Sequence, residues 1–429
     1  MGRFAKLLVI TLSVVVFCYV SIGFVLGQST TQQRPYRSLT VFTEVLAHIQ
    51  QDYVEDPNMP LVTAGAMHGL LEALDPQSGY LAPQEYAEYR KRADRPAKGD
   101  VGLALSKRFG YAAVVSVLPD SSAARAGVHA GDIIENIGGF TTREMSAGHA
   151  RMLLAGDLDT SVRISVLRSG RTEPQDIDLV RVAPVVPRLA FEKLSLPGAA
   201  GADSGVAYLR VPSFGAGRAE ELRARLTQLE KQGLRRLVLD LRDSAIGDIS
   251  EAVAAAQLFL DRGTIVSLRG QTIERQVFAA DPAKHVWKHP VTVVISNSTA
   301  GPAEVLAAAL ADNRRAQTVG ERTFGTASEQ KVIPLEDGGA IILTIANYYT
   351  PGGKSIPAEG VTPQVAVEEP AIGPEGPARV PVSEDLLVKK ALEVLAKPVA
   401  PAATAAPKAA LRVAPPLPAP PPRAAAETV

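Results

Sequence analysis

A predominantly apolar, uncharged segment lies near the N-terminus of the chain, from Leu7 to about Leu26. Arg3 and Lys6 precede this segment, and no acidic residue does. Roughly 20 apolar residues can span a bilayer, and a basic flank keeps the N-terminus on the cytoplasmic side. The pattern predicts a single-pass anchor within residues 1–30, in a bacterial inner membrane, with the bulk of the chain in the periplasm. A cleaved signal peptide is the alternative, which the length of the run disfavours.

After a short polar linker, apolar positions recur with the helical period of 3.6 residues. Ser38 is the expected N-cap of the first helix, and a second helix is expected from Thr63 to Leu74. Residues 38–95 are therefore predicted to form a helical region with buried faces. The apolar face of the first helix is made by Leu39, Phe42, Val45, Leu46 and Ile49.

The pattern changes to short strands and turns over residues 96–182. A β-rich run extends from Ala112 to Leu118, and a Gly-containing block from Ala126 to Ile134 follows it. A helix at about Ala147–Leu154 and a strand at Val162–Leu167 are expected to complete a small domain.

Strands and helices alternate over residues 183–368, which favours a mixed α/β core. Strands are expected at Gly205–Val211, Leu237–Arg242 and Val291–Ile295, and a helix at Ala219–Gln232. The strands with the longest apolar runs have the composition of buried strands in a parallel sheet.

The last segment, residues 369–429, is rich in Pro and Ala apart from one expected helix at Ser383–Leu395. The part beyond this helix is predicted to be a semi-extended tail.

The chain contains 45 Lys and Arg residues and 45 Asp and Glu residues. Its charges therefore balance, and no net charge favours binding to nucleic acid. A single Cys, Cys18, excludes a disulfide framework. The sequence lacks metal-ligand spacing and phosphate-binding glycine motifs, so no metal or other cofactor is expected.

The stretch from Val291 to Gln330 combines a strand, a polar turn and a helix. Pro302 suits the first helical position, and Glu304 suits the third, where an acid favours the positive end of the helix. In α/β enzymes a turn between a strand and a helix often holds a nucleophile.

This stretch resembles the C-terminal processing peptidases, or tail-specific proteases, which use a Ser–Lys dyad. Their pattern is S-A-S-A-S-E at the start of the helix and G-E-x-T-F-G-K-G-x-x-Q after it. Aligning Glu304 and Gly320–Gly325 places the nucleophile at Gly301 and the base at Thr326, with the family's spacing kept. Gly has no side chain to attack with, and a Thr hydroxyl is no base near neutral pH. The resemblance also implies that Gln330 matches a polar residue that assists the dyad.

A third departure follows the strand that ends at Arg242. The segment Arg242–Gly247 resembles the family's R-N-N-P-G-G, whose first Gly offers a backbone N–H to the oxyanion; here that Gly is Ile246, and Gly247 is kept. An Ile restricts the backbone and fills space where a substrate carbonyl approaches. Other family segments are preserved, namely Leu74–Leu81, Tyr348–Ile356 and Gly360–Pro363.

The block from Ala126 to Ile134 resembles the A-G-x-x-x-G-D-x-I signature of PDZ domains. The resemblance implies that a polypeptide adds as a strand to the sheet edge and that its terminal carboxylate is received near Val101, Gly102 and Leu103. A PDZ fold kept only as a spacer remains the alternative.

A relocated catalytic pair is a further possibility, because hydroxyl residues flank the two lost positions. Turn chemistry is the simpler interpretation of these residues, since Ser and Thr cap backbone groups in such loops. The hydroxyl residues are Ser296, Ser298, Thr299 and Ser328, and the candidate bases are Lys331, Lys354, His285 and His289.

Two hypotheses follow from these residues. The first is a membrane-anchored pseudoprotease that binds exported polypeptide C-termini through its PDZ domain, as a scaffold or as a regulator of an active relative. The second is an active serine-type endopeptidase with a relocated nucleophile.

Overall fold

The chain divides into two compact units, residues 1–66 and residues 67–429. The predicted anchor at residues 7–26 lies outside the described residues except for Phe17, and no helix within the described ranges is long and apolar enough to cross a membrane. The computed structural model describes residues 17, 33–94, 97–143, 145–184, 186–198, 205–370 and 380–396.

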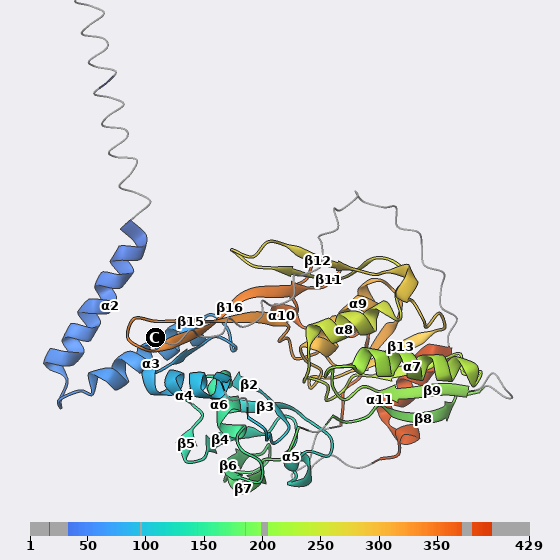
Figure 1. The fold of residues 1–429 in the computed structure, drawn as a ribbon, viewed down its shortest axis with the longest axis horizontal. Helices are drawn as coiled ribbons and strands as arrows, with labels where there is room; N and C mark the ends of the chain where they lie inside the picture. The colour runs from blue at the N-terminus through green and yellow to red at the C-terminus, as the bar shows by residue number, and fades with distance from the viewer. Residues whose placement is uncertain are drawn as a thin grey trace, which may run out of the picture. The chain divides into compact units, whose positions relative to one another are not determined.

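The first unit contains α2 (Gln33–Asp52), and α3 (Met59–Glu72) begins in it (Figure 1). Ser38 lies inside α2, so the prediction that it caps this helix is wrong. The helix begins upstream of Ser38, and Pro35 falls in its first turn, where a helix tolerates proline. The expected burial of the apolar face is also wrong for Leu39 and Val45, whose side chains are exposed.

A six-stranded sheet forms the centre of the second unit, in the order β17-β14-β13-β10-β9-β8. All neighbours are parallel except β8 and β9, and every residue of β10 and β13 is buried. Burial on both faces is what continuous apolar strands require, and it confirms the predicted α/β core. The strands are β8 (Ala190–Ser195), β9 (Gly205–Arg210), β10 (Leu237–Asp240), β13 (Val291–Ile295), β14 (Gln317–Gly320) and β17 (Val365–Ala366).

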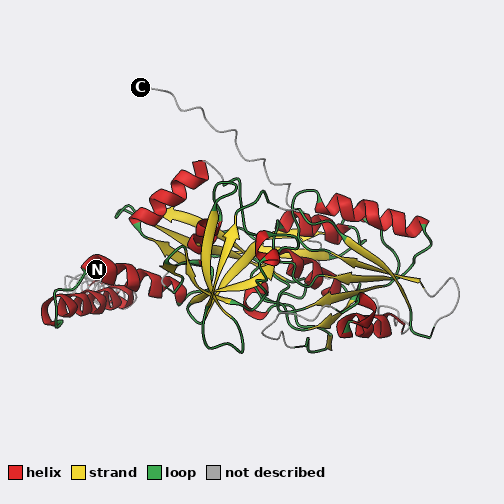
Figure 2. Cartoon of the chain, turned by 90° about the horizontal axis from the view of Figure 1, so that it is seen from below, coloured by secondary structure: helices red, strands yellow, loops and turns green. Residues whose placement is uncertain are grey.

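Helices cover both faces of this sheet (Figures 1 and 2). Apolar side chains of α7, α8 and α9 share one buried cluster with one face, and those of α11 share another with the opposite face. The helix expected near the Pro- and Ala-rich tail is therefore docked on the core. The helices are α7 (Arg218–Lys231), α8 (Ile249–Gln257), α9 (Pro302–Asp312) and α11 (Leu386–Ala396), with single turns η2 (Pro282–Lys284) and η3 (Val382–Glu384).

A second, antiparallel sheet joins segments that are far apart in the sequence, since β1 pairs with β16. Its order is β1-β16-β11-β12, with β15 also paired to β16. Its strands are β1 (Gly79–Leu81), β11 (Thr264–Arg269), β12 (Gln276–Ala279), β15 (Ser328–Pro334) and β16 (Ala340–Tyr349), and the helices α4 (Pro83–Asp94) and α10 (Ile356–Glu359) follow β1 and β16 in the chain.

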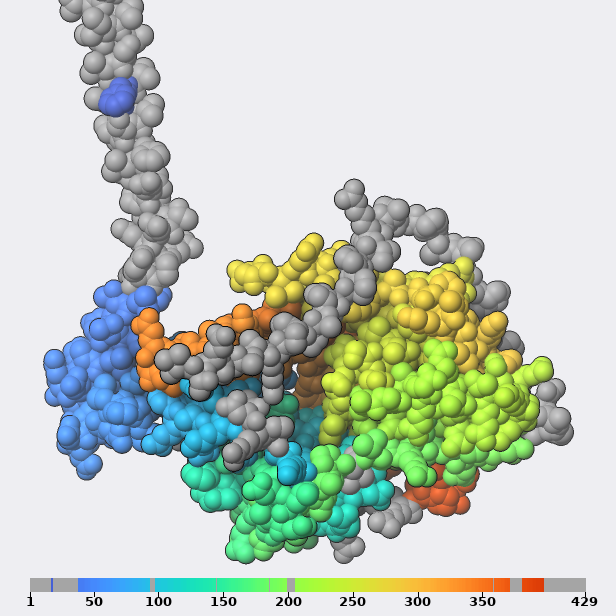
Figure 3. All heavy atoms as spheres, viewed as in Figure 1, coloured from blue at the N-terminus to red at the C-terminus, as the bar shows by residue number. Residues whose placement is uncertain are grey.

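The small domain expected at residues 96–182 has its own sheet, in the order β2-β3-β4-β6-β7 with β5 beside β4, and its own buried cluster. It belongs to the second unit, with the core (Figure 3). Strand β2 is at the edge of the sheet. The elements are β2 (Leu103–Arg108), β3 (Tyr111–Val117), α5 (Ser122–Arg125), β4 (Ile133–Ile137), β5 (Phe140–Thr141), α6 (Ala147–Leu154), β6 (Ser161–Leu167) and β7 (Gln175–Val180).

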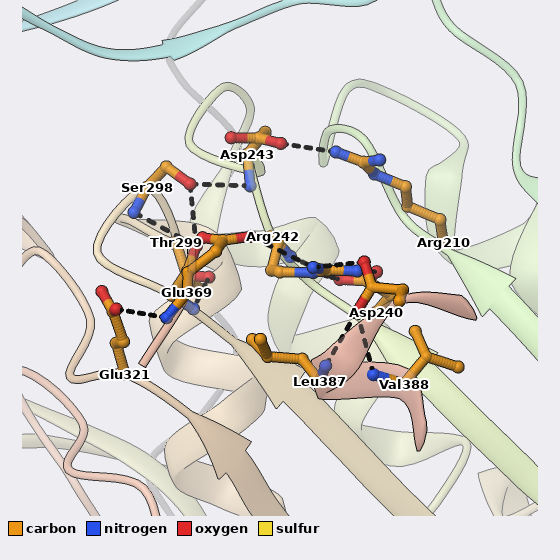
Figure 4. Close-up of polar contacts among 12 residues, drawn as sticks. Arg210, Asp240, Arg242, Asp243, Ser298, Thr299, Glu321, Glu369, Leu387 and Val388 are labelled. Carbon is orange, nitrogen blue, oxygen red and sulfur yellow. Dashed lines mark hydrogen bonds and ion pairs between the residues drawn. The ribbon is translucent and has the colours of Figure 1, made fainter. Parts of the chain in front are cut away.

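A buried ionic network fastens α11 to the end of β10 (Figure 4). Arg242 donates to the fully buried Asp240 (2.7 Å) and to Asp385 (2.9 Å) and Glu369 (3.1 Å). Asp385 in turn accepts from the first N–H groups of α11. Burial works to raise the pKa of Asp240, but the Arg242 guanidinium outweighs it and holds that pKa below its usual range.

Arg242→Met should lower the free energy of unfolding by about 3–5 kcal/mol, because it removes the ion-pair partner of the fully buried Asp240. Chemical denaturation of the full chain measures this loss. The control is Arg163→Met, which removes an exposed ion pair with Asp178 and should leave the transition almost unchanged. A small effect of Arg242→Met, equal to that of the control, would contradict the importance of this network.

Candidate functional site

The turn between β13 and α9 has the backbone of a nucleophile-bearing elbow. Gly301 is the N-cap of α9, with φ 54° and ψ −114°, a conformation that residues with side chains rarely adopt. Sharp turns of this kind present one residue at their apex, above the sheet. The structure therefore keeps the elbow at the position predicted for the nucleophile, and the residue at its apex is a glycine.

The carboxylate of Glu304 holds this elbow against the loop of residues 323–326. Glu304 is fully buried in the first turn of α9. It accepts hydrogen bonds from the backbone N–H groups of Gly301 (2.9 Å), Gly325 (2.7 Å) and Thr326 (2.8 Å), and from the hydroxyl of Thr323. Burial raises the pKa of Glu304 to about 7, against the four donors, which favour the charged form.

Residues 301 and 326 consequently lie side by side. A Cβ atom added to Gly301 would lie 3.8 Å from the Thr326 Oγ1 and 3.7 Å from the Ala245 carbonyl oxygen, which are ordinary contact distances. The two positions that the motif alignment predicts for a nucleophile and its base are thus adjacent, and the space for a side chain at residue 301 is present. No side chain occupies that space.

Residues 246 and 247 lie where the motif of the resembled family has two glycines, and the backbone packing restricts only one of them. Gly247 has φ 131°, and a Cβ atom there would come within 2.2 Å of the Phe214 backbone, with which Gly247 forms a β-bridge. The backbone packing therefore requires this glycine. Ile246 has no such restriction: its carbonyl accepts from the Phe214 N–H (2.8 Å), and it lines the cavity beside the elbow.

Pro302 is a further departure that the motif comparison missed. The residue after a nucleophile commonly supplies a backbone N–H to the oxyanion. Proline has no N–H. The sequence contained this signal, but the proline was interpreted only as a favourable first residue of a helix.

A cavity of about 650 Å³ joins this elbow to the small domain. Thr326, Pro302 and Ile246 line it from the core, and residues of β2 and α6 line it from the small domain. The two regions that the sequence predicts as catalytic and peptide-binding therefore open into one cleft. Gln330 also lines it, and its Nε2 donates to the Ser328 Oγ (2.8 Å).

The predicted carboxylate-binding loop, residues 101–103, leads into the edge strand β2. Val101 and Leu103 are buried, and Gly102 has φ 82°, with Ser121 so close that a Cβ atom at Gly102 would lie 2.2 Å from its Cβ. The loop is tightly packed, and the Gly102 N–H donates to the carboxylate of Asp100 (2.6 Å).

The hydroxyl residues near Gly301 serve the turn itself. Ser298 is 4% exposed; its Oγ accepts from the Asp243 N–H (3.2 Å) and contacts the Ser296 Oγ (2.8 Å) (Figure 4). Thr299 donates to the Leu241 carbonyl (2.9 Å). Ser298 lines a second cavity, of about 440 Å³, and not the cleft at Gly301.

None of the four candidate bases lines the cleft. Lys354 lies 3.9 Å from Glu359, and His289 lies 3.5 Å from Glu230. His285 bonds the carbonyl of Trp287. Trp287, which lies between the two histidines in the sequence, is fully buried and anchors this segment in the core. Lys331 is exposed on β15.

The geometry agrees with the proteins that this chain resembles. Residues 205–367 match the model of peptidase family S41, and residues 114–168 match that of the PDZ domain. A carboxy-terminal-processing protease of Bartonella bacilliformis is 31% identical over 81% of this chain and 79% of its own. A chloroplastic C-terminal processing peptidase of Tetradesmus obliquus is 32% identical over 74% of this chain and 71% of its own. A structure of the photosystem II D1 C-terminal processing protease superposes with a TM-score of 0.61, at 29% identity, over 75% of this chain and 85% of that one.

The stabilising effect of Glu304 should depend on pH. Its pKa is about 7 in the fold and 4.5 in an exposed Glu, so the folded chain binds more protons between these values. The free energy of unfolding, relative to that of Glu304→Gln, should therefore fall with rising pH across this window, by at most about 1.4 kcal/mol per pH unit. Denaturation of both proteins at several pH values measures the difference. A difference that grows with pH would mean that the four donors hold the pKa below 4.5.

Proposed function

The chain belongs to peptidase family S41, the carboxy-terminal-processing proteases, and on that premise we propose that it is a pseudoprotease. It binds polypeptide C-termini through its PDZ domain and holds them without cleaving them, as a scaffold or as a regulator of an active relative.

One observation carries this proposal: an intact elbow presents Gly301 beside Thr326, with room for a nucleophile and with none present. Loss of the nucleophile or the base costs a serine hydrolase up to about 10⁶ in kcat. Pro302 also removes a backbone donor where an oxyanion would form. These changes act on one reaction site and leave the elbow and the cleft in place.

The proposed location rests on the sequence. The apolar run at residues 7–26 has the length of a single-pass anchor. Arg3 and Lys6 before it are the basic flank of an anchor whose following domains lie in the periplasm. Exported polypeptide C-termini are the matching partners, and the balanced charge of the chain offers nucleic acid no general attraction.

The alternative, an active peptidase with Ser298 as its nucleophile, has less support. The Ser298 hydroxyl is buried and bonded within its own turn, and it faces a different cavity from the cleft that PDZ and core share. A nucleophile needs an adjacent base and access to the substrate.

A fluorophosphonate probe that reacts with activated serines should leave the full chain unlabelled, because the residue at the apex of the elbow is Gly301 and not a serine. Gly301→Ser/Pro302→Ala/Thr326→Lys is the matched positive control, which restores the nucleophile, the N–H donor and the base. Labelling is measured by intact mass. Labelling of the natural chain that disappears in Ser298→Ala would overturn the proposal in favour of a relocated nucleophile.

A further inference from the structure

The cleft shared by the PDZ domain and the core contains very few charges. Of the described residues that line it, only Asp100 and Arg151 have ionisable side chains that are charged at neutral pH; the others are apolar, small or neutral polar residues. Any charged group of a bound polypeptide must therefore be recognised by these two side chains or by backbone dipoles.

Asp100 already occupies the backbone donor that a terminal carboxylate is expected to use. Its Oδ1 accepts the Gly102 N–H at 2.6 Å, in the centre of the 101–103 loop. A second carboxylate entering the loop would have to displace Asp100 and approach a like charge in a partly desolvated site, which is unfavourable. The loop is thus poorly suited to receive a carboxylate.

Arg151 lies on the face of α6 that lines the cleft, together with Ala147 and Ala155. Gly156, just after α6, forms a β-bridge with Gly99, which places the end of the helix beside the start of the loop. Four residues of helix rise only about 6 Å, so Arg151 lies about one turn from this end.

The contacts of the Arg151 guanidinium with the described part of the fold are too weak to give it a structural role. Arg92 donates to the carbonyl of Ala155, the C-cap of α6 (3.0 Å), and Arg181 donates to that of Leu154, the last residue of the helix (3.0 Å). Arg151 itself is exposed, and its Nε makes a long bond (3.4 Å) to the Ala147 carbonyl. Within the part of the chain that the structure describes, no carboxylate forms an ion pair with it.

We propose that Arg151, and not the 101–103 loop, receives the carboxylate of a polypeptide bound along β2. An Arg binds a carboxylate through two parallel N–H donors, which gives orientation as well as charge recognition. The carboxylate is that of the chain terminus or of an acidic side chain near it; both present the same group. This inference rests on the proposed peptide binding and names its specificity.

The test uses the full chain and four labelled peptides of one apolar sequence. They combine a free or an amidated C-terminus with Glu or Gln two residues before it. Fluorescence anisotropy should give the doubly neutral peptide the weakest affinity and at least one acidic peptide an affinity about tenfold higher. If the peptide with a free C-terminus gains affinity, the carboxylate is that of the chain terminus. If the peptide with Glu gains affinity, it is that of the side chain.

Arg151→Gln should abolish this gain, so that the acidic peptides bind this variant with the same Kd as the neutral peptide does. Arg125→Gln removes an equal charge outside the cleft and should keep the gain, which controls for long-range attraction. Asp100→Asn keeps an oxygen acceptor for Gly102, and the gain should persist in it.

The inference is overturned if the gain survives Arg151→Gln. An increase of the gain in Asp100→Asn would then identify the loop as the receiving group. Equal affinity of all four peptides would also overturn it, and would leave peptide binding by the PDZ domain intact. If none of the four peptides binds, the proposed function itself fails, and this inference falls with it.

Discussion

The buried carboxylate of Glu304 is the contact on which the geometry of this site depends. It accepts hydrogen bonds from the N-cap of α9 and from three residues of the 323–326 loop, two segments that the sequence separates. These bonds involve mostly backbone N–H groups, so they do not depend on the side chains at residues 301 and 326. The elbow can therefore persist when its nucleophile and base are replaced, because neither side chain holds it in place.

Some family residues hold the backbone in place and others act only through their side chains in the reaction. This distinction explains which family residues remain. Gly247 stays because the Phe214 backbone leaves no room for a Cβ atom, whereas Ile246 stands where the family has a glycine. Glu304 stays because its loss would release the loop. At positions 301, 302 and 326, which the motif alignment assigns to the reaction, the chain has Gly, Pro and Thr. A fold can thus keep its cleft while the function of that cleft changes.

Much of this could be predicted from the sequence. The apolar run Val291–Ile295 and the helix Ala147–Leu154 were predicted at their observed limits, because strong periodicity fixes such elements. The adjacency of residues 301 and 326 followed from motif spacing. The bond between Asp100 and Gly102 could not be predicted, since it depends on a side-chain rotamer. The docking of α11 was missed because its partners are distant in the sequence: the apolar face of the sheet, and Arg242, which pairs with Asp385 just before the helix. The departure at Pro302 was visible but was assigned to helix formation alone.

The most direct test of the central claim measures binding and cleavage on one sample. The full chain is incubated with an unstructured polypeptide that has an apolar, acidic C-terminus, the complex is isolated by size exclusion, and the mass of the bound polypeptide is determined. The account predicts that the polypeptide binds and is recovered intact. Recovery of the polypeptide shortened near its C-terminus, by the natural chain and not by its Ser298→Ala variant, would contradict it.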